Sequence, residues 1–225
     1  MATNKVNNKI AALLQKSEWA QARALLERER DKEPDNHWVL TQLGVTYYEQ
    51  GRYDDALELF AESLPIVPDC PLTLWNIAGT LDALGRHAEA VPVYVWLLQS
   101  NKSPAEDPCW ESKEWTETLK TDCLYRLGVC SQMLGKTQQA QQCFHQYANL
   151  LLSGIHGSYP IEDVMRQLQG LHRNGKHGGA ESELRKAVAS TLEVSGIEPR
   201  QGRATAPPKI NTAKVLSGRP VASKR

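Results

Sequence analysis

The sequence has no apolar stretch that could cross a membrane. Its longest run of large apolar residues, Val91–Leu98, has eight residues and contains Pro92, whereas a membrane-spanning helix needs about 20. The N-terminal residues also lack the apolar core of a secretory signal. We therefore expect a cytoplasmic protein that does not insert into a membrane.

Cysteine is scarce and poorly arranged for disulfides or zinc. The five cysteines are an odd number and form no Cys-x-x-Cys pair, so a reducing compartment is expected rather than a disulfide framework. Cys123 and Cys130 share a helix face and are followed by Cys143 and His145, but zinc ligands usually come in tighter pairs. Buried free thiols are the favoured interpretation, and the sequence predicts no metal and no cofactor.

The motifs of several enzyme classes are missing as well. There is no Gly-x-Gly-x-x-Gly loop, no phosphate-binding loop and no serine-centred nucleophile elbow. Acidic pairs such as Asp54 and Asp55 suit the first turn of a helix better than acid–base catalysis. We expect no catalytic residues and a protein that is not an enzyme.

Acidic residues are absent from the C-terminal end, although the net charge of the whole chain is zero. Residues 200–225 carry seven basic, no acidic and no aromatic residues, while residues 1–154 carry 14 basic and 20 acidic ones. The tail has few large apolar side chains to offset the entropy of ordering, so residues 195–225 are predicted to be disordered. Such a basic tail attracts nucleic acid only weakly and in a salt-dependent way.

What the chain does contain is a repeat with a period of about 34 residues, a length typical of solenoids built from helix–turn–helix hairpins. Shifted by this period, Gly51 falls on Gly85, Ala22 falls on Ala56, and Ala56 falls on Ala90. One gap restores the register further along the chain, and a second, shorter gap restores it more weakly. Several copies in one register indicate a stack of such hairpins.

Each good copy places the same residue types at the same points of a helical hairpin. In the first helix, small Gly44 lies on the apolar face and allows the second helix to approach at Ala56, so a bulky replacement should cost about 1–3 kcal/mol. Gly51 suits the left-handed conformation that ends a helix. The matching residues in the three good copies are Leu40, Leu43, Gly44, Tyr47, Gly51, Ala56, Phe60 and Pro68; Leu74, Ile77, Ala78, Gly85, Ala90 and Tyr94; and Leu124, Leu127, Gly128, Gly135, Ala140 and Phe144.

This pattern resembles the tetratricopeptide repeat family. Residues 37–70, 71–104 and 121–154 match it well, and residues 3–36 and 161–194 match it more weakly, as terminal repeats often do. The resemblance implies an all-α, right-handed α-solenoid of four to five helix–turn–helix repeats, the last of them a degenerate capping repeat, followed by the disordered tail.

Residues 105–120 are an insertion in this pattern. Pro108 is placed to start a helix, and from Trp110 nothing breaks the helical pattern before Gly128. We therefore expect a long first helix in the fourth repeat, projecting beyond the stack. Trp110 and Trp115 are candidate partner contacts on this spur; the alternative is that both fold back over the third repeat.

The resemblance also implies a binding groove, because the first helix of each repeat lines a concave surface in this family. The corresponding positions form an apolar and aromatic floor, and Trp and Tyr are frequent hot spots of protein interfaces. The alternative is that Trp38 or Trp75 packs into the next repeat. The predicted groove residues are Trp38, Thr41, Val45, Tyr48, Leu72, Trp75, Tyr125 and Val129.

The predicted function is a non-catalytic adaptor or scaffold that binds another protein. The cations with which some family members bind a C-terminal carboxylate are missing from the matching positions, so an apolar helix or extended peptide fits the groove better. Two alternatives stay open. One is a nucleic-acid-associated factor that uses the basic tail, and the other is a homo-oligomeric scaffold that self-assembles through Trp38, Trp75 or the spur.

Overall fold

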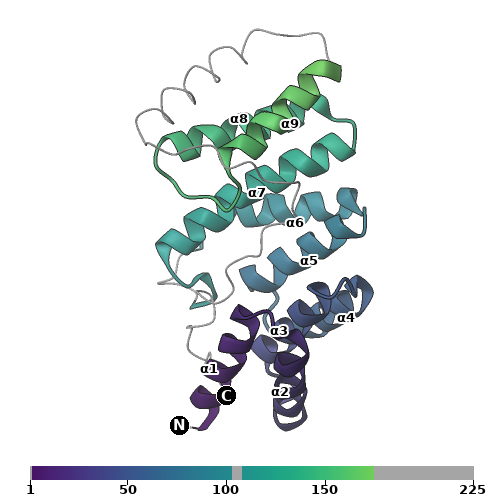
Figure 1. The fold of residues 1–225 in the computed structure, drawn as a ribbon, viewed down its shortest axis with the longest axis vertical. Helices are drawn as coiled ribbons and strands as arrows, with labels where there is room; N and C mark the ends of the chain where they lie inside the picture. The colour runs from purple at the N-terminus through teal and green to yellow at the C-terminus, as the bar shows by residue number, and fades with distance from the viewer. Residues whose placement is uncertain (1, 103–107, 175–225) are drawn as a thin grey trace. The chain divides into compact units, whose positions relative to one another are not determined.

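The computed structural model describes residues 2–102 and 108–174, and within these ranges the chain is helical with no strand (Figure 1). The predicted all-α class is confirmed for these residues, whereas the basic tail 195–225 and the second half of the repeat 161–194 lie outside them. The helices are α1 (Ala2–Gln15), α2 (Trp19–Lys32), α3 (His37–Tyr48), α4 (Tyr53–Ser63), α5 (Pro71–Ala83), α6 (His87–Gln99), α7 (Lys113–Met133), α8 (Thr137–Leu152) and α9 (Ile161–Asn174), with a 3-10 turn η1 (Pro108–Trp110) before α7.

The chain divides into two compact units, with the boundary between Thr116 and Glu117 inside α7. The described part of the first unit holds α1 to α6, η1 and the start of α7. The described part of the second unit holds the rest of α7 together with α8 and α9. Each unit is described by itself below.

The turns between paired helices adopt the conformation that the repeat predicts. Gly51 and Gly85 have φ values of 74° and 73°, in the left-handed region that only glycine enters without strain. Ser17 stands at the equivalent place of the first, weaker repeat and also has a positive φ of 60°. The backbone geometry of the turn is therefore kept even where the glycine is not.

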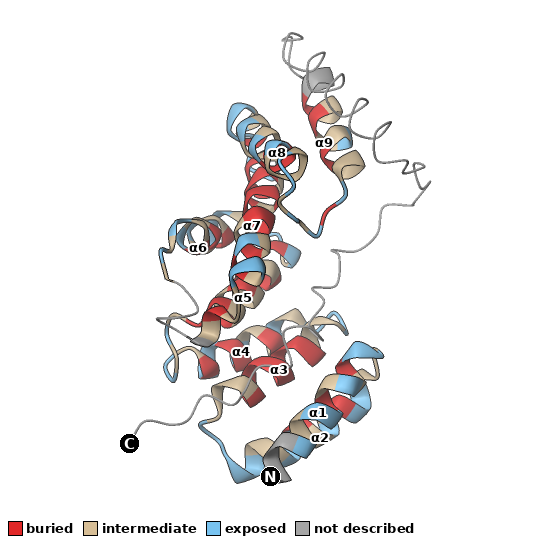
Figure 2. Cartoon of the chain, turned by 90° about the vertical axis from the view of Figure 1, so that its left-hand side faces the viewer, coloured by how far each residue is buried: buried red, intermediate tan, exposed pale blue. Residues whose placement is uncertain are grey.

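In the first unit, consecutive helices pack against one another from α1 to α6, and α3 also contacts α5. The first helices of the second and third repeats are thus direct neighbours. Buried residues line the facing sides of these helices, while exposed residues lie on the outside and in the turns (Figure 2). One apolar cluster ties α1, α2, α3 and α4 together around Ile10, Leu26 and Leu43.

The two helices of a hairpin meet where a small residue faces an aromatic ring. A Cβ atom at Gly44 would lie only 2.4 Å from Cε1 of Phe60, and one at Gly128 in the second unit would lie 2.7 Å from Cε1 of Phe144. Both rings are fully buried. The close approach predicted from the repeat pattern therefore exists in both units.

The helix of the insertion begins later in the chain than the sequence predicts. The helix expected from Trp110 begins at Lys113, because Pro108–Trp110 forms a 3-10 turn and the Ser112 side chain accepts the backbone N–H of Trp115 at 3.1 Å. As expected, α7 is long, with 21 residues. Trp110 is fully buried with its ring edge-on to that of Trp115. Trp110 is therefore an interior residue and offers no surface contact to a partner.

Candidate functional site

The eight predicted groove residues fall into two groups of equal size. Thr41, Val45, Trp75 and Tyr125 are buried. The side chains that keep part of their surface exposed are Trp38, Tyr48, Leu72 and Val129.

The buried groove positions of the first unit serve packing between repeats. The Thr41 hydroxyl lies 2.9 Å from the Ser63 hydroxyl and 2.8 Å from that of Thr73, so it joins α3 to α4 and α5. Trp75 is 6% exposed and packs edge-on against Tyr94 of α6, with ring centroids 5.5 Å apart. Neither side chain is placed to contact a partner without rearrangement.

In the second unit the chain itself covers Tyr125, one of the two predicted groove positions of α7. The ring of Tyr125 stacks on that of Tyr159, which precedes α9, with centroids 3.8 Å apart. One helical turn earlier, the carboxylate of Asp122 accepts the backbone N–H and the hydroxyl of Ser158 at 2.8 and 2.5 Å. Burial raises the pKa of Asp122 to about 6, against the hydrogen bonds from Ser158 and the charge of Arg126.

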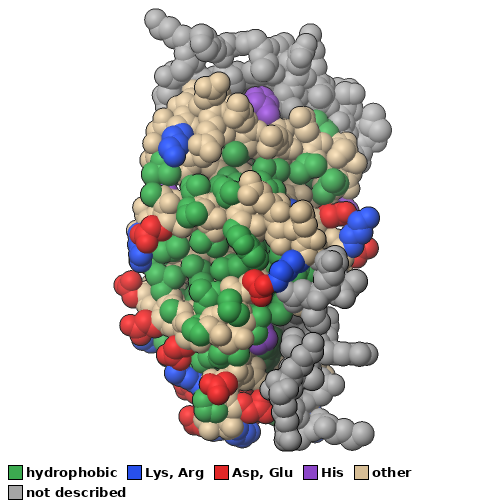
Figure 3. Space-filling view, turned by 180° about the vertical axis from the view of Figure 1, so that it is seen from behind, with side chains coloured by type: hydrophobic (Ala, Val, Ile, Leu, Met, Phe, Trp, Pro, Cys, Tyr) green, Lys and Arg blue, Asp and Glu red, His purple; other side chains and the backbone are tan. Residues whose placement is uncertain are grey.

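The accessible positions of the first unit lie on α3 and α5. Trp38 packs its inner side on the apolar cluster around Leu43, and Leu72 stands at the equivalent place of the next repeat. At the other end of α3, Tyr48 contacts Tyr53 with ring centroids 5.3 Å apart. Hydrophobic side chains also gather on the face of the molecule seen from behind (Figure 3).

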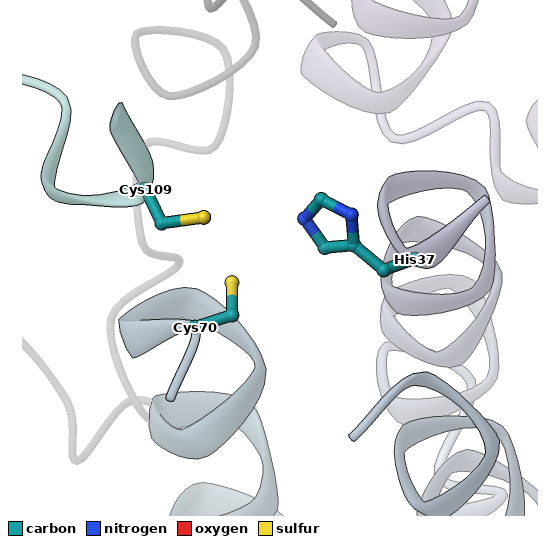
Figure 4. A group of neighbouring side chains, drawn as sticks. All are labelled: His37, Cys70 and Cys109. Atoms are coloured by element: carbon teal, nitrogen blue, oxygen red, sulfur yellow. The ribbon is translucent and has the colours of Figure 1, made fainter. Parts of the chain in front are cut away.

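A second group of side chains converges at the N-terminal ends of α3 and α5. His37 is the first residue of α3, Cys70 immediately precedes α5, and Cys109 lies in η1. The two thiols and the imidazole point toward one another (Figure 4). One imidazole nitrogen and the two Sγ atoms all lie within 4.8 Å of one another.

The thiol of Cys70 is the most perturbed group of this cluster. A hydrogen bond with Cys109 holds its pKa below the usual range, with further contributions from His37 and Thr73, although burial acts in the opposite direction. Burial raises the pKa of the Glu111 carboxyl to about 7, and the charge of Cys70 adds to this rise. A sulfur that is readily deprotonated is a better ligand for soft metals and a stronger nucleophile.

Sequence reasoning missed this cluster, because the candidate metal ligands it weighed were Cys123, Cys130, Cys143 and His145, and the histidines His156, His172 and His177. His37, Cys70 and Cys109 are widely separated along the chain, so no compact motif marks them. The signal that the sequence did offer was the position of the two cysteines relative to prolines and to the repeat. Both cysteines of the cluster adjoin a proline, and Cys70 stands one repeat period after Asn36, the residue that caps α3. Cys123 and Cys130 are fully buried, in agreement with their interpretation as core thiols.

Helical hairpins joined by positive-φ turns, with small residues facing aromatic rings, define an all-α protein of the helical-repeat class. Family models described as tetratricopeptide repeat match residues 13–77 and residues 122–150. The chain therefore carries tetratricopeptide repeats in each of its two units. This class provides scaffolds for protein–protein interaction, and the predicted family is confirmed.

Solved structures with the same fold support the solenoid architecture. A double mutant of MamA RS-1 is 16% identical with a TM-score of 0.63, covering 86% of this chain and 96% of its own. MamA AMB-1 is 20% identical with a TM-score of 0.58, covering 87% and 92%. Residues 41-end of MamA from Desulfovibrio magneticus RS-1 are 15% identical with a TM-score of 0.60, covering 86% and 95%. No match was found among the curated proteins.

Within residues 2–102 and 108–174, none of the helices combines the length and the apolar character that a bilayer crossing requires.

Proposed function

We propose that the chain is a non-catalytic adaptor that binds an apolar helix or extended segment of another protein along α3 and α5 of its first unit. The observation that carries this proposal is the partial exposure of Trp38 and Leu72 at equivalent places of two first helices. Because α3 contacts α5, the proposal assigns the two side chains to one surface. Tyr48 extends this apolar surface toward the other end of α3.

The proposed footprint is smaller than the groove predicted from the sequence. Thr41, Val45 and Trp75 support the surface from below, since each of them is buried. On α7 only Val129 keeps part of its surface among the predicted positions, so the second unit is assigned no main contact. Stacked repeats hold the surface in place before a partner arrives, which keeps the loss of entropy on binding small for this chain.

The two alternative functions from the sequence make different demands. A nucleic-acid-associated factor would depend on the basic tail, whose residues lie outside those described. A self-assembling scaffold would use an apolar surface of the same kind as that of Trp38 and Leu72. Both alternatives are outcomes of the experiment below, since neither has a structural observation of its own.

Replacement of Trp38 by alanine is expected to weaken partner binding by about 2 kcal/mol, which corresponds to a loss of roughly 30-fold in affinity. The reason is that an indole seated on a packed cluster offers a large contact area at little cost in entropy. Proteins would be captured from native lysate with the full-length chain and with the variant, and the affinity of each captured protein would then be measured by calorimetry.

Trp96→Ala is the matched control, because Trp96 lies on α6, a second helix, and is 41% exposed. It removes the same indole from a different surface and should leave partner binding unchanged. Equal losses in the two variants would refute a specific surface on α3 and α5. Capture that disappears at moderate salt and after removal of residues 200–225 would favour the nucleic-acid alternative, and concentration-dependent sedimentation would favour self-assembly.

A further inference from the structure

We propose that His37, Cys70 and Cys109 form a zinc site that fastens the insertion to the second and third repeats. The proposal is independent of the partner-binding surface. It rests on the convergence of three metal-binding side chains from three separate elements, the start of α3, the residue before α5, and η1.

The geometry of the three side chains needs little change to hold a metal. Around a tetrahedral Zn²⁺ with Zn–S bonds of about 2.3 Å and Zn–N bonds of about 2.0 Å, neighbouring ligand atoms lie about 3.5–3.8 Å apart. The three ligand atoms already lie within 4.8 Å of one another, and both sulfurs and the imidazole point into the same space (Figure 4). Small rotations of the side chains would therefore complete the site.

The donor set selects the class of metal. Two thiolates and one imidazole are soft and borderline ligands that suit Zn²⁺, whereas Mg²⁺ and Ca²⁺ require oxygen ligands. Cys70 is 4% exposed, and His37 and Cys109 are partly buried, so the ion would be shielded from bulk water. Three protein ligands leave a fourth position, which a water molecule or the carboxylate of nearby Glu111 can fill.

The surroundings hold two of the ligands in place. The backbone carbonyl of His37 accepts a hydrogen bond from the Ser63 hydroxyl at 3.1 Å, and Ser63 in turn bonds Thr41. Thr41 also bonds Thr73, which lies in the first turn of α5, shortly after Cys70. This buried hydroxyl network joins the start of α3 to the start of α5 and so fixes the backbone that carries His37 and Cys70 relative to each other.

The consequence of binding would be structural. The three ligands are well separated along the chain, each from the next by about the length of one repeat, so one ion would close two long loops of the chain and restrict the unfolded state. It would also anchor η1, which contacts α5 and carries the buried Trp110. A metal bound to the folded chain and not to the unfolded chain stabilises the fold by linkage.

The test uses the full-length chain, reduced, purified without oxygen and stripped of metal with a chelator. Co²⁺ is added as a spectroscopic probe, and Zn²⁺ is added afterwards to displace it. We expect one Co²⁺ per chain, with a thiolate-to-cobalt charge-transfer band and the visible bands of a tetrahedral site, and stoichiometric replacement by Zn²⁺. Cys109→Ser and His37→Ala should each weaken metal binding by more than the roughly 10–100-fold that loss of an outer partner costs.

Cys143→Ser and His156→Ala are the matched controls, because Cys143 and His156 lie in the second unit, outside the cluster. Both should bind metal like the natural chain. Alkylation followed by mass spectrometry adds a readout that does not depend on the variants, since Zn²⁺ should protect the partly exposed Cys109 but not the similarly exposed Cys143. Substoichiometric metal, unchanged binding in Cys109→Ser, or equal alkylation with and without Zn²⁺ would overturn the proposal. A Cys70–Cys109 disulfide that forms in air while the reduced protein binds no metal would overturn it as well and point to redox chemistry instead.

Discussion

Replacement of Gly44 by valine is expected to destabilise the first unit by about 3 kcal/mol. A Cβ atom at this position would lie 2.4 Å from Cε1 and within 2.9 Å of two further atoms of the Phe60 ring. Phe60 is fully buried, so its ring has no free space to occupy. The two helices of the hairpin must therefore separate or the ring must leave its rotamer, and both responses disturb a close-packed core.

Gly79→Ala is the matched control for the effect of adding a Cβ atom. Gly79 lies in α5, the first helix of the next repeat, and a Cβ there would be 3.9 Å from the nearest atom, the Tyr94 hydroxyl oxygen. Alanine favours a helix over glycine by about 1 kcal/mol, so Gly79→Ala should be neutral or stabilising. Gly44→Ala gains the same propensity but meets the Phe60 ring, and its net loss should be about 1–2 kcal/mol.

The free energies of unfolding would be measured by urea denaturation followed by circular dichroism. Phe60→Leu makes room beside position 44, so the double variant with Gly44→Val should lose less than the sum of the two single variants, with a coupling of about 1 kcal/mol. Strict additivity, or a Gly44→Val variant as stable as the natural chain, would show that the hairpin has more freedom at this contact than its packing indicates.

The sequence pattern predicted the hairpins correctly because their determinants are local and repeated. Gly51 and Gly85 mark turns that need a left-handed residue, and Gly44 and Phe60 occupy complementary places in adjacent helices. The start of α7 could not be predicted in the same way. Pro108 is compatible with both a 3-10 turn and an α-helix, and the hydrogen bond of the Ser112 side chain, not a proline, decides where α7 begins.

The candidate sites were less predictable, because burial depends on contacts between distant parts of the chain. The place of Trp75 in the repeat predicts which face of its helix it occupies. It does not predict that Tyr94 packs against the indole ring. Tyr125 likewise occupies a groove position, yet Tyr159 stacks on it from a segment one repeat period further along the chain. The cluster of His37, Cys70 and Cys109 is harder still to foresee, since its members meet only after two repeats and the insertion have folded.

These observations assign different roles to residues that share a repeat position. Trp38, Leu72 and Asp122 are each the second residue of their repeat in the matches 37–70, 71–104 and 121–154. The first two keep part of their surface exposed on neighbouring helices, whereas Asp122 is buried beneath the segment that contains Ser158. The same backbone scaffold thus presents an apolar surface in one unit and a covered carboxylate in the other.

The buried carboxylate of Asp122 makes the stability of the second unit depend on pH. Burial raises the pKa of Asp122 from 3.8 to about 6 in the folded chain, so the folded state holds this proton more tightly than the unfolded state does. The associated stability is therefore fully present below about pH 4 and is lost as pH rises through about 6. A shift of this size corresponds to about 3 kcal/mol, and Asp122 is only 4% exposed, so screening by solvent is small.

We therefore compare the unfolding free energy of Asp122→Asn with that of the natural chain at several pH values. As the pH is raised from about 4 to about 7, the difference should move in favour of the variant by about 2.5 kcal/mol. Asparagine keeps the shape of the side chain but cannot ionise, so the difference isolates this one titration from all other groups. Asp35→Asn, at an exposed turn position, removes the same charge from the surface and controls for the change in net charge. If the Asp122→Asn difference did not change with pH, the Ser158 hydrogen bonds would have to stabilise the carboxylate enough to cancel the effect of its burial.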